Sequence, residues 1–228
     1  MSFAGKRKIA VIGGGAAGIM AALSASAHGA DVTVFEHTDS IGKKILQTGN
    51  GKCNFTNVIM SADKYHTSGD RMFIEKILDH FGNEDAIRFM SSIGIYTKNR
   101  KGGLYPYTET AATVLDILRM ELRKCGVRVL LKCGDVKIGN EPSVNGEKYD
   151  AVIIAAGSNA APKTGSDGSG YKIAKQLGIT LIRPVPALTP LLLEDDVREL
   201  VGIRCDAELT LVYGGKIIDQ SKGELQPV

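Results

Sequence analysis

Residues 8–36 read KIAVIGGGAAGIMAALSASAHGADVTVFE, and this stretch decides the fold class. It opens with a short apolar run, rich in β-branched residues, that leads directly into three glycines; this is typical of a buried parallel strand. Residues 16–28 are rich in Ala, Met and Leu and stop at Gly29, so they are expected to form a helix. Residues 31–35 predict a second strand. The stretch therefore predicts a β-α-β unit of about 30 residues.

The turn between the first strand and the helix carries the pattern Gly-x-Gly-x-x-Gly. Gly13 permits a tight turn, Gly15 lets the backbone approach a pyrophosphate, and Gly18 allows the helix to pack closely on the strand. Ala16 and Ala17 begin the helix, where unpaired N–H groups and the helix dipole favour negative charge. We therefore expect the phosphates of a dinucleotide to bind at this turn.

Glu36 ends the second predicted strand. A carboxylate at that position can accept hydrogen bonds from both ribose hydroxyls of an adenosine, and its charge repels a 2′-phosphate. The pocket is therefore expected to prefer FAD or NAD to NADP. The glycine turn alone does not separate FAD from NAD, nor does it exclude a protein that binds S-adenosylmethionine.

A second short apolar strand is predicted over residues 151–155 and runs into Ala155-Ala156-Gly157. This ending resembles the Ala-Thr-Gly element of two-dinucleotide-binding flavoproteins, whose strand returns the chain to the pyrophosphate. Ala156 stands where Thr is usual, so one hydroxyl contact is absent. The element favours FAD, and all three residues are assigned to the cofactor.

The other elements follow from the same patterns of spacing and capping. Asp70 and Asn83 are expected helix N-caps. Val136, in a short predicted strand, is counted with the cofactor-binding residues. An amphipathic helix is predicted over 110–125, where apolar side chains recur at helical spacing at Val114, Leu115, Leu118 and Leu122. The other expected elements are helices over 70–81, 83–93 and 171–177, a hairpin over 94–107, and strands over 127–132 and 135–138.

The character of the sequence changes after Pro184-Val185-Pro186. Residues 205–212 and 216–219 alternate around Gly214-Gly215 and predict a hairpin. We expect a Rossmann-like α/β domain with a parallel sheet over residues 1–183. The start of a β-rich inserted domain is expected over residues 184–228.

Four stretches carry a family resemblance, and they occur in the order GKKIL at 42–46, TGNGKCNFTN at 48–57, GLYP at 103–106 and PKTGSDGSGY at 162–171. With the glycine turn they resemble the bacterial FAD-dependent oxidoreductases often labelled aminoacetone-oxidase-like, a family that includes bile-acid-reductase-like proteins. The second stretch is the most specific, although Lys52 stands where Arg is usual. The resemblance implies an FAD fold interrupted by a smaller domain, and a longer protein of which this chain is the N-terminal part.

The resemblance also assigns the loop over residues 42–57 to the flavin side of the cofactor. Its lysines could neutralise the pyrophosphate or stabilise a reduced, anionic flavin. Because no second cysteine lies nearby in the sequence, Cys53 is expected to be a buried packing thiol and not a redox partner. The loop residues assigned to the cofactor are Lys43, Lys44, Gly49, Gly51, Lys52, Cys53, Asn54 and Thr56.

Composition narrows the class of function. The chain has 28 basic and 25 acidic residues, a net charge of +3, and no sustained basic stripe, which argues against a dedicated nucleic-acid binder. No stretch approaches the ~20 apolar residues that span a membrane. The four cysteines form no Cys-x-x-Cys pair, which argues against a metal site and favours reduced thiols in a cytoplasm.

The sequence therefore predicts an FAD-dependent oxidoreductase that passes a hydride or electrons between the flavin and a small organic substrate, with NAD(P)H as a candidate donor. No catalytic acid or base is assigned, because neither a Ser-His-Asp arrangement nor a convincing carboxylate pair is present. The alternatives are a non-catalytic or truncated dinucleotide-binding fragment and an NAD- or S-adenosylmethionine-dependent enzyme without flavin.

Overall fold

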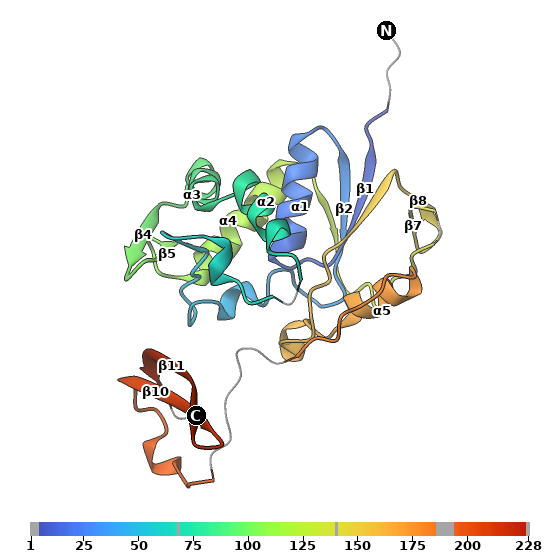
Figure 1. Ribbon diagram of the computed structural model, residues 1–228. Helices are drawn as coiled ribbons and strands as arrows, with labels where there is room; N and C mark the ends of the chain where they lie inside the picture. Colours follow the sequence, from blue (N-terminus) through green and yellow to red (C-terminus); the bar gives the residue numbers. More distant parts are fainter. Residues whose placement is uncertain (1–4, 68, 140, 186–193, 227–228) are drawn as a thin grey trace. The chain divides into compact units, whose positions relative to one another are not determined.

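A computed structural model describes residues 5–67, 69–139, 141–185 and 194–226 (Figure 1). The chain divides into two compact units, Met1–Ile182 and Arg183–Val228. Pro186, in the segment where the sequence changes character, lies outside the described residues. Each unit is described by itself.

The first unit is built on a parallel sheet with the strand order β6-β2-β1-β9. The α/β fold class with a parallel sheet is thus confirmed. Because the strands are parallel, their carboxyl ends meet at one edge, where ligands bind in open α/β sheets. The four strands are β1 (Lys8–Ile12), β2 (Asp31–Phe35), β6 (Arg128–Leu130) and β9 (Ala151–Ile154).

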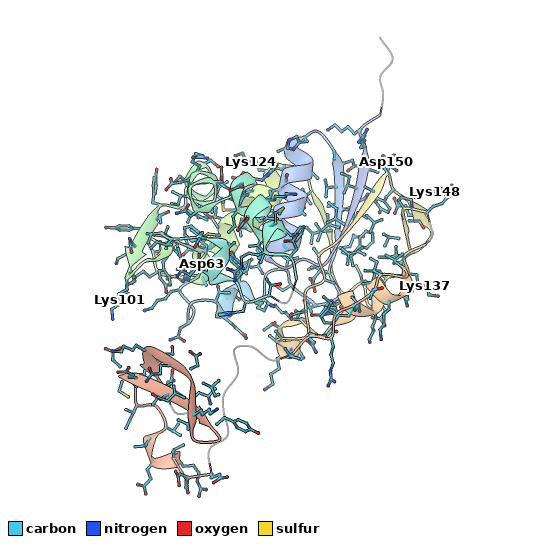
Figure 2. All side chains as sticks on the ribbon, in the orientation of Figure 1. Asp63, Lys101, Lys124, Lys137, Lys148 and Asp150 are labelled. Atoms are coloured by element: carbon cyan, nitrogen blue, oxygen red, sulfur yellow. The ribbon has the colours of Figure 1, made fainter. Side chains whose placement is uncertain are left out.

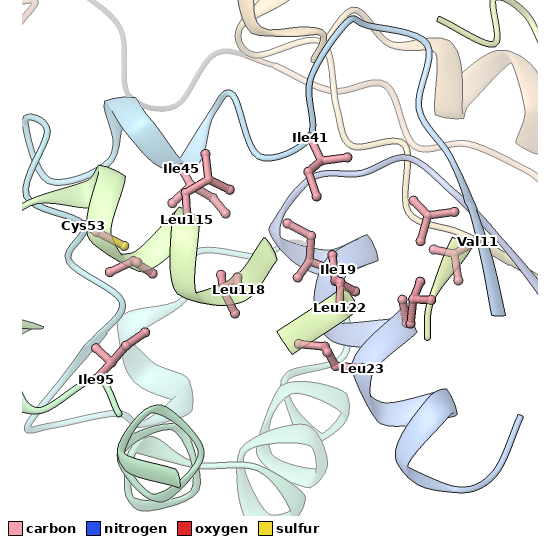
Figure 3. Packing of buried hydrophobic residues seen from close by; sticks show 14 of the residues in the cluster. Val11, Ile19, Leu23, Ile41, Ile45, Cys53, Ile95, Leu115, Leu118 and Leu122 are labelled. Atoms are coloured by element: carbon pink, nitrogen blue, oxygen red, sulfur yellow. The ribbon is translucent and has the colours of Figure 1, made fainter. Parts of the chain in front are cut away.

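Successive side chains of the strands enter two separate hydrophobic clusters, because side chains alternate between the faces of a sheet. Val11 packs in the larger cluster with helices α1 (Ala16–Ala27) and α4 (Ala111–Lys124). Ile12 packs in the smaller cluster with residues of strand β7 (Ser143–Val144) and helix α5 (Ser169–Gln176). Figure 3 shows Leu115, Leu118 and Leu122 of α4 in the larger cluster. The helical spacing predicted for this segment is therefore confirmed.

The predicted helices and hairpin are confirmed with small shifts at their ends (Figure 1). The α-helices are α1 (Ala16–Ala27), α2 (Arg71–His80), α3 (Asn83–Ser92), α4 (Ala111–Lys124) and α5 (Ser169–Gln176). A second sheet has the order β3-β5-β4, formed by β3 (Thr56–Asn57), β4 (Thr97–Arg100) and β5 (Gly103–Pro106). Single 3-10 turns lie at Ile45–Gln47, Ala62–Lys64 and Pro162–Thr164.

One of the two predicted N-caps is wrong. Asp70 caps α2, since its side chain accepts a hydrogen bond from the Met72 N–H at 2.9 Å. The N-cap of α3 is Gly82 and not Asn83, because the Asp85 carboxylate reaches back to accept the Gly82 N–H at 2.8 Å. The Asn83 side chain instead donates to the Val58 carbonyl.

The strand predicted over residues 135–138 is also wrong. Only Ile138 forms an isolated bridge, to Val144 in the small hairpin of β7 (Ser143–Val144) and β8 (Glu147–Lys148). Val136 and Ile138 are nevertheless packed against the smaller cluster. The apolar side chains of this segment therefore add partly buried packing to the cluster and do not form a strand in a ladder.

The second unit contains a 3-10 turn at Arg198–Leu200 and the predicted hairpin. Its strands are β10 (Cys205–Tyr213) and β11 (Lys216–Leu225), and they pair around Gly214 and Gly215 with one register shift between Leu211 and Val212. β11 runs beyond the predicted end because its partner strand continues to supply hydrogen bonds as far as Cys205. Among the residues described, no helix combines the length and apolar character needed to cross a bilayer.

Candidate functional site

The glycine turn lies at the carboxyl edge of the sheet, directly after β1. Gly13 has φ of 103°, and a Cβ added to it would lie 2.6 Å from the Ala155 carbonyl oxygen. A Cβ on Gly18 would overlap the carbonyl oxygen of Gly13. A Cβ on Gly15, by contrast, would meet no atom within 4 Å. The turn is therefore tight at Gly13, closely packed at Gly18 and open at Gly15.

The start of α1 faces open space beside this turn. Gly15 is the N-cap residue, Ala16 and Ala17 are exposed, and no side chain of the described residues caps the helix. Uncapped helices leave N–H groups without intrahelical partners, which makes the N-terminus a site for anions. This turn has the form that a bound diphosphate requires.

Glu36 follows β2 and is only 6% exposed. Its Oε2 accepts the Gly14 N–H at 2.7 Å, and its Oε1 accepts the Thr38 N–H at 2.8 Å. The ring of His37 lies 3.6 Å from Oε1. Because each carboxylate oxygen can accept two hydrogen bonds, these two bonds leave one lone pair on each oxygen unused. The side chain therefore holds the glycine turn through two backbone N–H groups.

A cavity of about 480 Å³ opens beside the turn, and the neighbours of Glu36 in the chain, Phe35 and His37, line it, whereas Glu36 itself does not. Gly13, Val136 and Ala156 all line it, so three segments that are far apart in the sequence meet there. From α5, polar residues line this cavity together with the apolar Ile173, and Figure 2 shows Lys137 beside that helix. The volume of the cavity falls within the ~300–1,000 Å³ of small-molecule sites. The lining residues to which the sequence gave no cofactor role include His37, Asp135, Asp167, Ser169, Lys172 and Gln176, of which Asp167 and Ser169 belong to the family stretch 162–171.

The end of β9 and the residues after it, Ala155-Ala156-Gly157, lie against the glycine turn. The Ala155 N–H donates to the Ile12 carbonyl at 2.8 Å, and Gly157 has φ of 76°. A Cβ on Gly170 would lie 3.1 Å from the Gly157 carbonyl oxygen, so α5 approaches this bend closely. Ala156 is thereby held between the turn and the cavity.

The loop over residues 42–57 is tied to the turn at one end and to β5 at the other. The Gly42 N–H donates to the Gly14 carbonyl at 2.8 Å, and the Phe55 N–H to the Leu104 carbonyl at 3.0 Å. Between these ends the chain winds tightly, since a Cβ on Gly49 would lie 2.6 Å from the Asn54 nitrogen. The loop thus runs from the sheet edge to the second sheet.

The side chains assigned to the cofactor in this loop have different surroundings. Lys43 pairs with Asp39 at 2.6 Å, whereas Lys44 donates to the Ser166 hydroxyl at 3.0 Å. Thr56 is buried and its hydroxyl contacts the Met60 sulfur, so that hydroxyl is already used. None of the loop residues assigned to the cofactor lines the cavity beside the turn; these are Lys43, Lys44, Gly49, Gly51, Lys52, Cys53, Asn54 and Thr56.

Cys53 lies in the larger hydrophobic cluster with Ile45 and Leu115 (Figure 3). Burial raises the pKa of its thiol, and the Thr48 side chain offsets this only in part. Because the thiolate is the reactive form, a raised pKa disfavours nucleophilic or redox chemistry. The surroundings agree with the predicted packing role.

We expect Cys53 to resist alkylation in the native protein. Exposed Cys125 should react with iodoacetamide at neutral pH, whereas Cys53 should react only after denaturant is added, because it is buried and its thiol remains protonated. Peptide mass spectrometry after timed labelling measures both sites. Equal labelling of the two cysteines in the folded protein would contradict the buried position.

A family model described as the HI0933-like protein Rossmann domain matches residues 7–220. The chain belongs to this FAD-dependent family. The resemblance to bile-acid-reductase-like flavoproteins is thereby confirmed.

Two curated relatives are similar over most of the chain. A 3-dehydro-bile acid delta(4,6)-reductase from Clostridium scindens is 39% identical over 96% of this chain and 56% of its own length. A ribosomal RNA dihydrouridine synthase from Haemophilus influenzae is 30% identical over 92% of this chain and 56% of its own. The chain spans about half the length of these relatives.

A solved structure supports the fold. The 3-ketosteroid-delta4-(5alpha)-dehydrogenase of Rhodococcus jostii RHA1, in complex with 4-androstene-3,17-dione, superposes with a TM-score of 0.54. The match covers 78% of this chain and 55% of that chain at 16% identity. Identity this low supports the Rossmann-like architecture alone.

Proposed function

We propose that this chain is the FAD-binding half of an oxidoreductase that adds hydrogen across a carbon–carbon double bond conjugated to a carbonyl group. The observation that carries the proposal is the meeting, at one sheet edge, of the open glycine turn, the buried Glu36 carboxylate and the cavity. These are the parts that a dinucleotide needs, and they occur in a chain of an FAD-dependent family.

The chain's own residues fit the adenosine half of FAD. The N–H groups of Gly15 and Ala16 would hold the diphosphate, and the free acceptor positions of Glu36 would hold the ribose. The cavity beside Val136 and Ala156 would enclose the adenine. Bound flavin supplies hydride transfer to and from carbon, while the protein orients it and excludes water.

The substrate class is proposed from the chemistry that the relatives' names share. Both the bile-acid reductase and the dihydrouridine synthase are named for adding hydrogen across a ring double bond. We propose a small unsaturated ketone as the first candidate, because identity is higher to the bile-acid enzyme. NAD(P)H is proposed as the electron donor, since each turnover consumes two electrons that must be returned to the flavin. A cytoplasmic location is proposed as well, and the free cysteines support it.

Ribosomal RNA is the second candidate substrate. Two relatives, from Haemophilus influenzae and Escherichia coli, are named ribosomal RNA dihydrouridine synthases. The small net charge that argued against nucleic acid does not by itself exclude an enzyme that acts on one uridine. The predicted absence of a nucleic-acid partner therefore stays a prediction.

The proposal is tested in steps on the purified chain. FAD is added first, and saturable quenching of flavin fluorescence is the expected result. NADH or NADPH is then added without oxygen, and loss of the visible flavin absorbance separates an enzyme from a binding fragment. A conjugated steroid dienone and a uridine-containing ribosomal RNA fragment are finally compared as oxidants of the reduced flavin. A chain that binds neither FAD nor ADP would overturn the proposal.

A further inference from the structure

The loop over residues 158–167 follows β9 and forms part of the wall of the cavity. Asp167, at its end, lines the cavity, and Ser166 beside it is buried with 6% exposure. The loop is closed on itself by the hydrogen bond from the Gly168 N–H to the Ser158 carbonyl at 3.2 Å. Its position against the rest of the sheet edge must come from contacts with other segments.

Lys44 supplies such a contact from the loop that follows β2. Its Nζ donates to the Ser166 Oγ at 3.0 Å, and the same Oγ donates to the Ser158 carbonyl at 2.8 Å. The donor and acceptor roles of these two hydrogen bonds are compatible, because the Lys44 ammonium can only donate, whereas the Ser166 hydroxyl can accept one bond and donate the other. One buried hydroxyl thus joins two segments that are remote in sequence.

A second contact brings the same loop to the end of β2. A Cβ on Gly165 would lie 2.8 Å from the Thr38 side chain and 3.2 Å from the His37 ring. The His37 ring lies 4.0 Å from the Asp167 carboxylate and 3.6 Å from that of Glu36. The loop therefore lies directly on the segment that carries the proposed ribose-binding carboxylate.

We propose that Lys44 and Ser166 are positioning residues that fasten the 158–167 loop as a wall of the nucleotide cavity. This inference rests on the proposed function for the identity of the nucleotide. It gives Lys44 a role other than neutralising phosphate, because its ammonium is engaged with the Ser166 hydroxyl. Lys44 then acts on the cofactor through Ser166 and the loop.

The fastening itself is tested without any nucleotide, by amide hydrogen exchange of the purified chain. Lys44→Met and Ser166→Ala should each speed exchange in residues 158–167, because both remove the same hydrogen bond. Lys163→Met, an exposed lysine of that loop, is the matched control and should leave exchange unchanged. Ser166→Thr keeps the hydroxyl, so exchange in residues 158–167 should stay as slow as in the unchanged chain. Unchanged exchange in both Lys44→Met and Ser166→Ala would overturn the inference.

The consequence for binding is tested with FAD, ADP and FMN as probes. Lys44→Met should weaken FAD and ADP about tenfold and leave FMN unaffected, because the wall encloses the adenosine half. Ser166→Ala should weaken them at least as much, because it also removes the hydrogen bond to the Ser158 carbonyl. The double variant should be no weaker than Ser166→Ala alone, since Lys44 acts only through Ser166.

Two outcomes separate this inference from the proposed function. If Ser166→Ala binds like the unchanged chain while Lys44→Met is weak, Lys44 acts by its charge and the positioning role is wrong. If the unchanged chain binds no FAD, the proposed function fails, and the exchange comparison still decides whether Lys44 fastens the loop.

Discussion

Replacing Gly18 by alanine is expected to unfold the first unit. The added Cβ would overlap the carbonyl oxygen of Gly13, a backbone atom that cannot move away because Gly13 is itself pressed against Ala155. Ordinary overpacking in a core costs about 1–3 kcal/mol. A clash with fixed backbone at the sheet edge should exceed about 4 kcal/mol, which approaches the whole stability of a marginal domain. Far-UV circular dichroism and urea unfolding measure the loss.

Gly15→Ala is the matched comparison for this prediction. A Cβ there meets no atom within 4 Å, and φ of −75° is accessible to alanine, so the fold should be retained. The methyl group would instead occupy space needed by the diphosphate, and FAD affinity should fall by about 10–100-fold through loss of charge-assisted hydrogen bonds. A Gly18→Ala chain with the unfolding midpoint of the unchanged protein would contradict the close packing described for α1.

Replacing Glu36 by leucine is expected to cost both stability and cofactor affinity. The buried carboxylate accepts the N–H groups of Gly14 and Thr38, and leucine would leave both donors without a partner. Each unpaired buried donor costs about 1–3 kcal/mol, so the total should lie at about 2–6 kcal/mol. FAD affinity should fall further because the ribose loses its acceptor. Urea unfolding and fluorescence titration measure the two losses separately.

Two variants control the Glu36 prediction. Glu75→Leu, at an exposed position of α2, should change the free energy of unfolding by no more than about 0.5 kcal/mol. Glu36→Gln keeps one acceptor oxygen but turns its NH₂ group toward one of the two backbone donors, so its losses should be intermediate. Unchanged FAD affinity in Glu36→Leu would show that the ribose is held elsewhere.

The β-α-β unit could be predicted because its information is local. The spacing of Gly13, Gly15 and Gly18 specifies one turn, and the structure gives each glycine the steric surroundings that its proposed role requires. The spacing of Leu115, Leu118 and Leu122 likewise identified the buried face of α4. Short-range periodicity was sufficient for both features.

The complete lining of the cavity could not be predicted, because the folded chain brings together segments that are far apart in the sequence. Gly13, Val136 and Ala156 were assigned to the cofactor, but His37 was not, and Asp167 was part of a family stretch without a role of its own. Lys44 was assigned to the cofactor by the family resemblance and its charge, whereas its position beside Ser166 depends on a contact across the fold. Val136 was placed in a short strand that the fold does not form, although its side chain packs against the smaller cluster.

Amide NMR of the chain during a titration with ADP tests the central claim most directly. The account predicts saturable shifts of the Gly14, Gly15 and Ala16 signals together with Val136, since the turn would hold the phosphates and the cavity the adenine. Shifts confined to other residues, or turn signals that stay in place at saturating ADP, would contradict it.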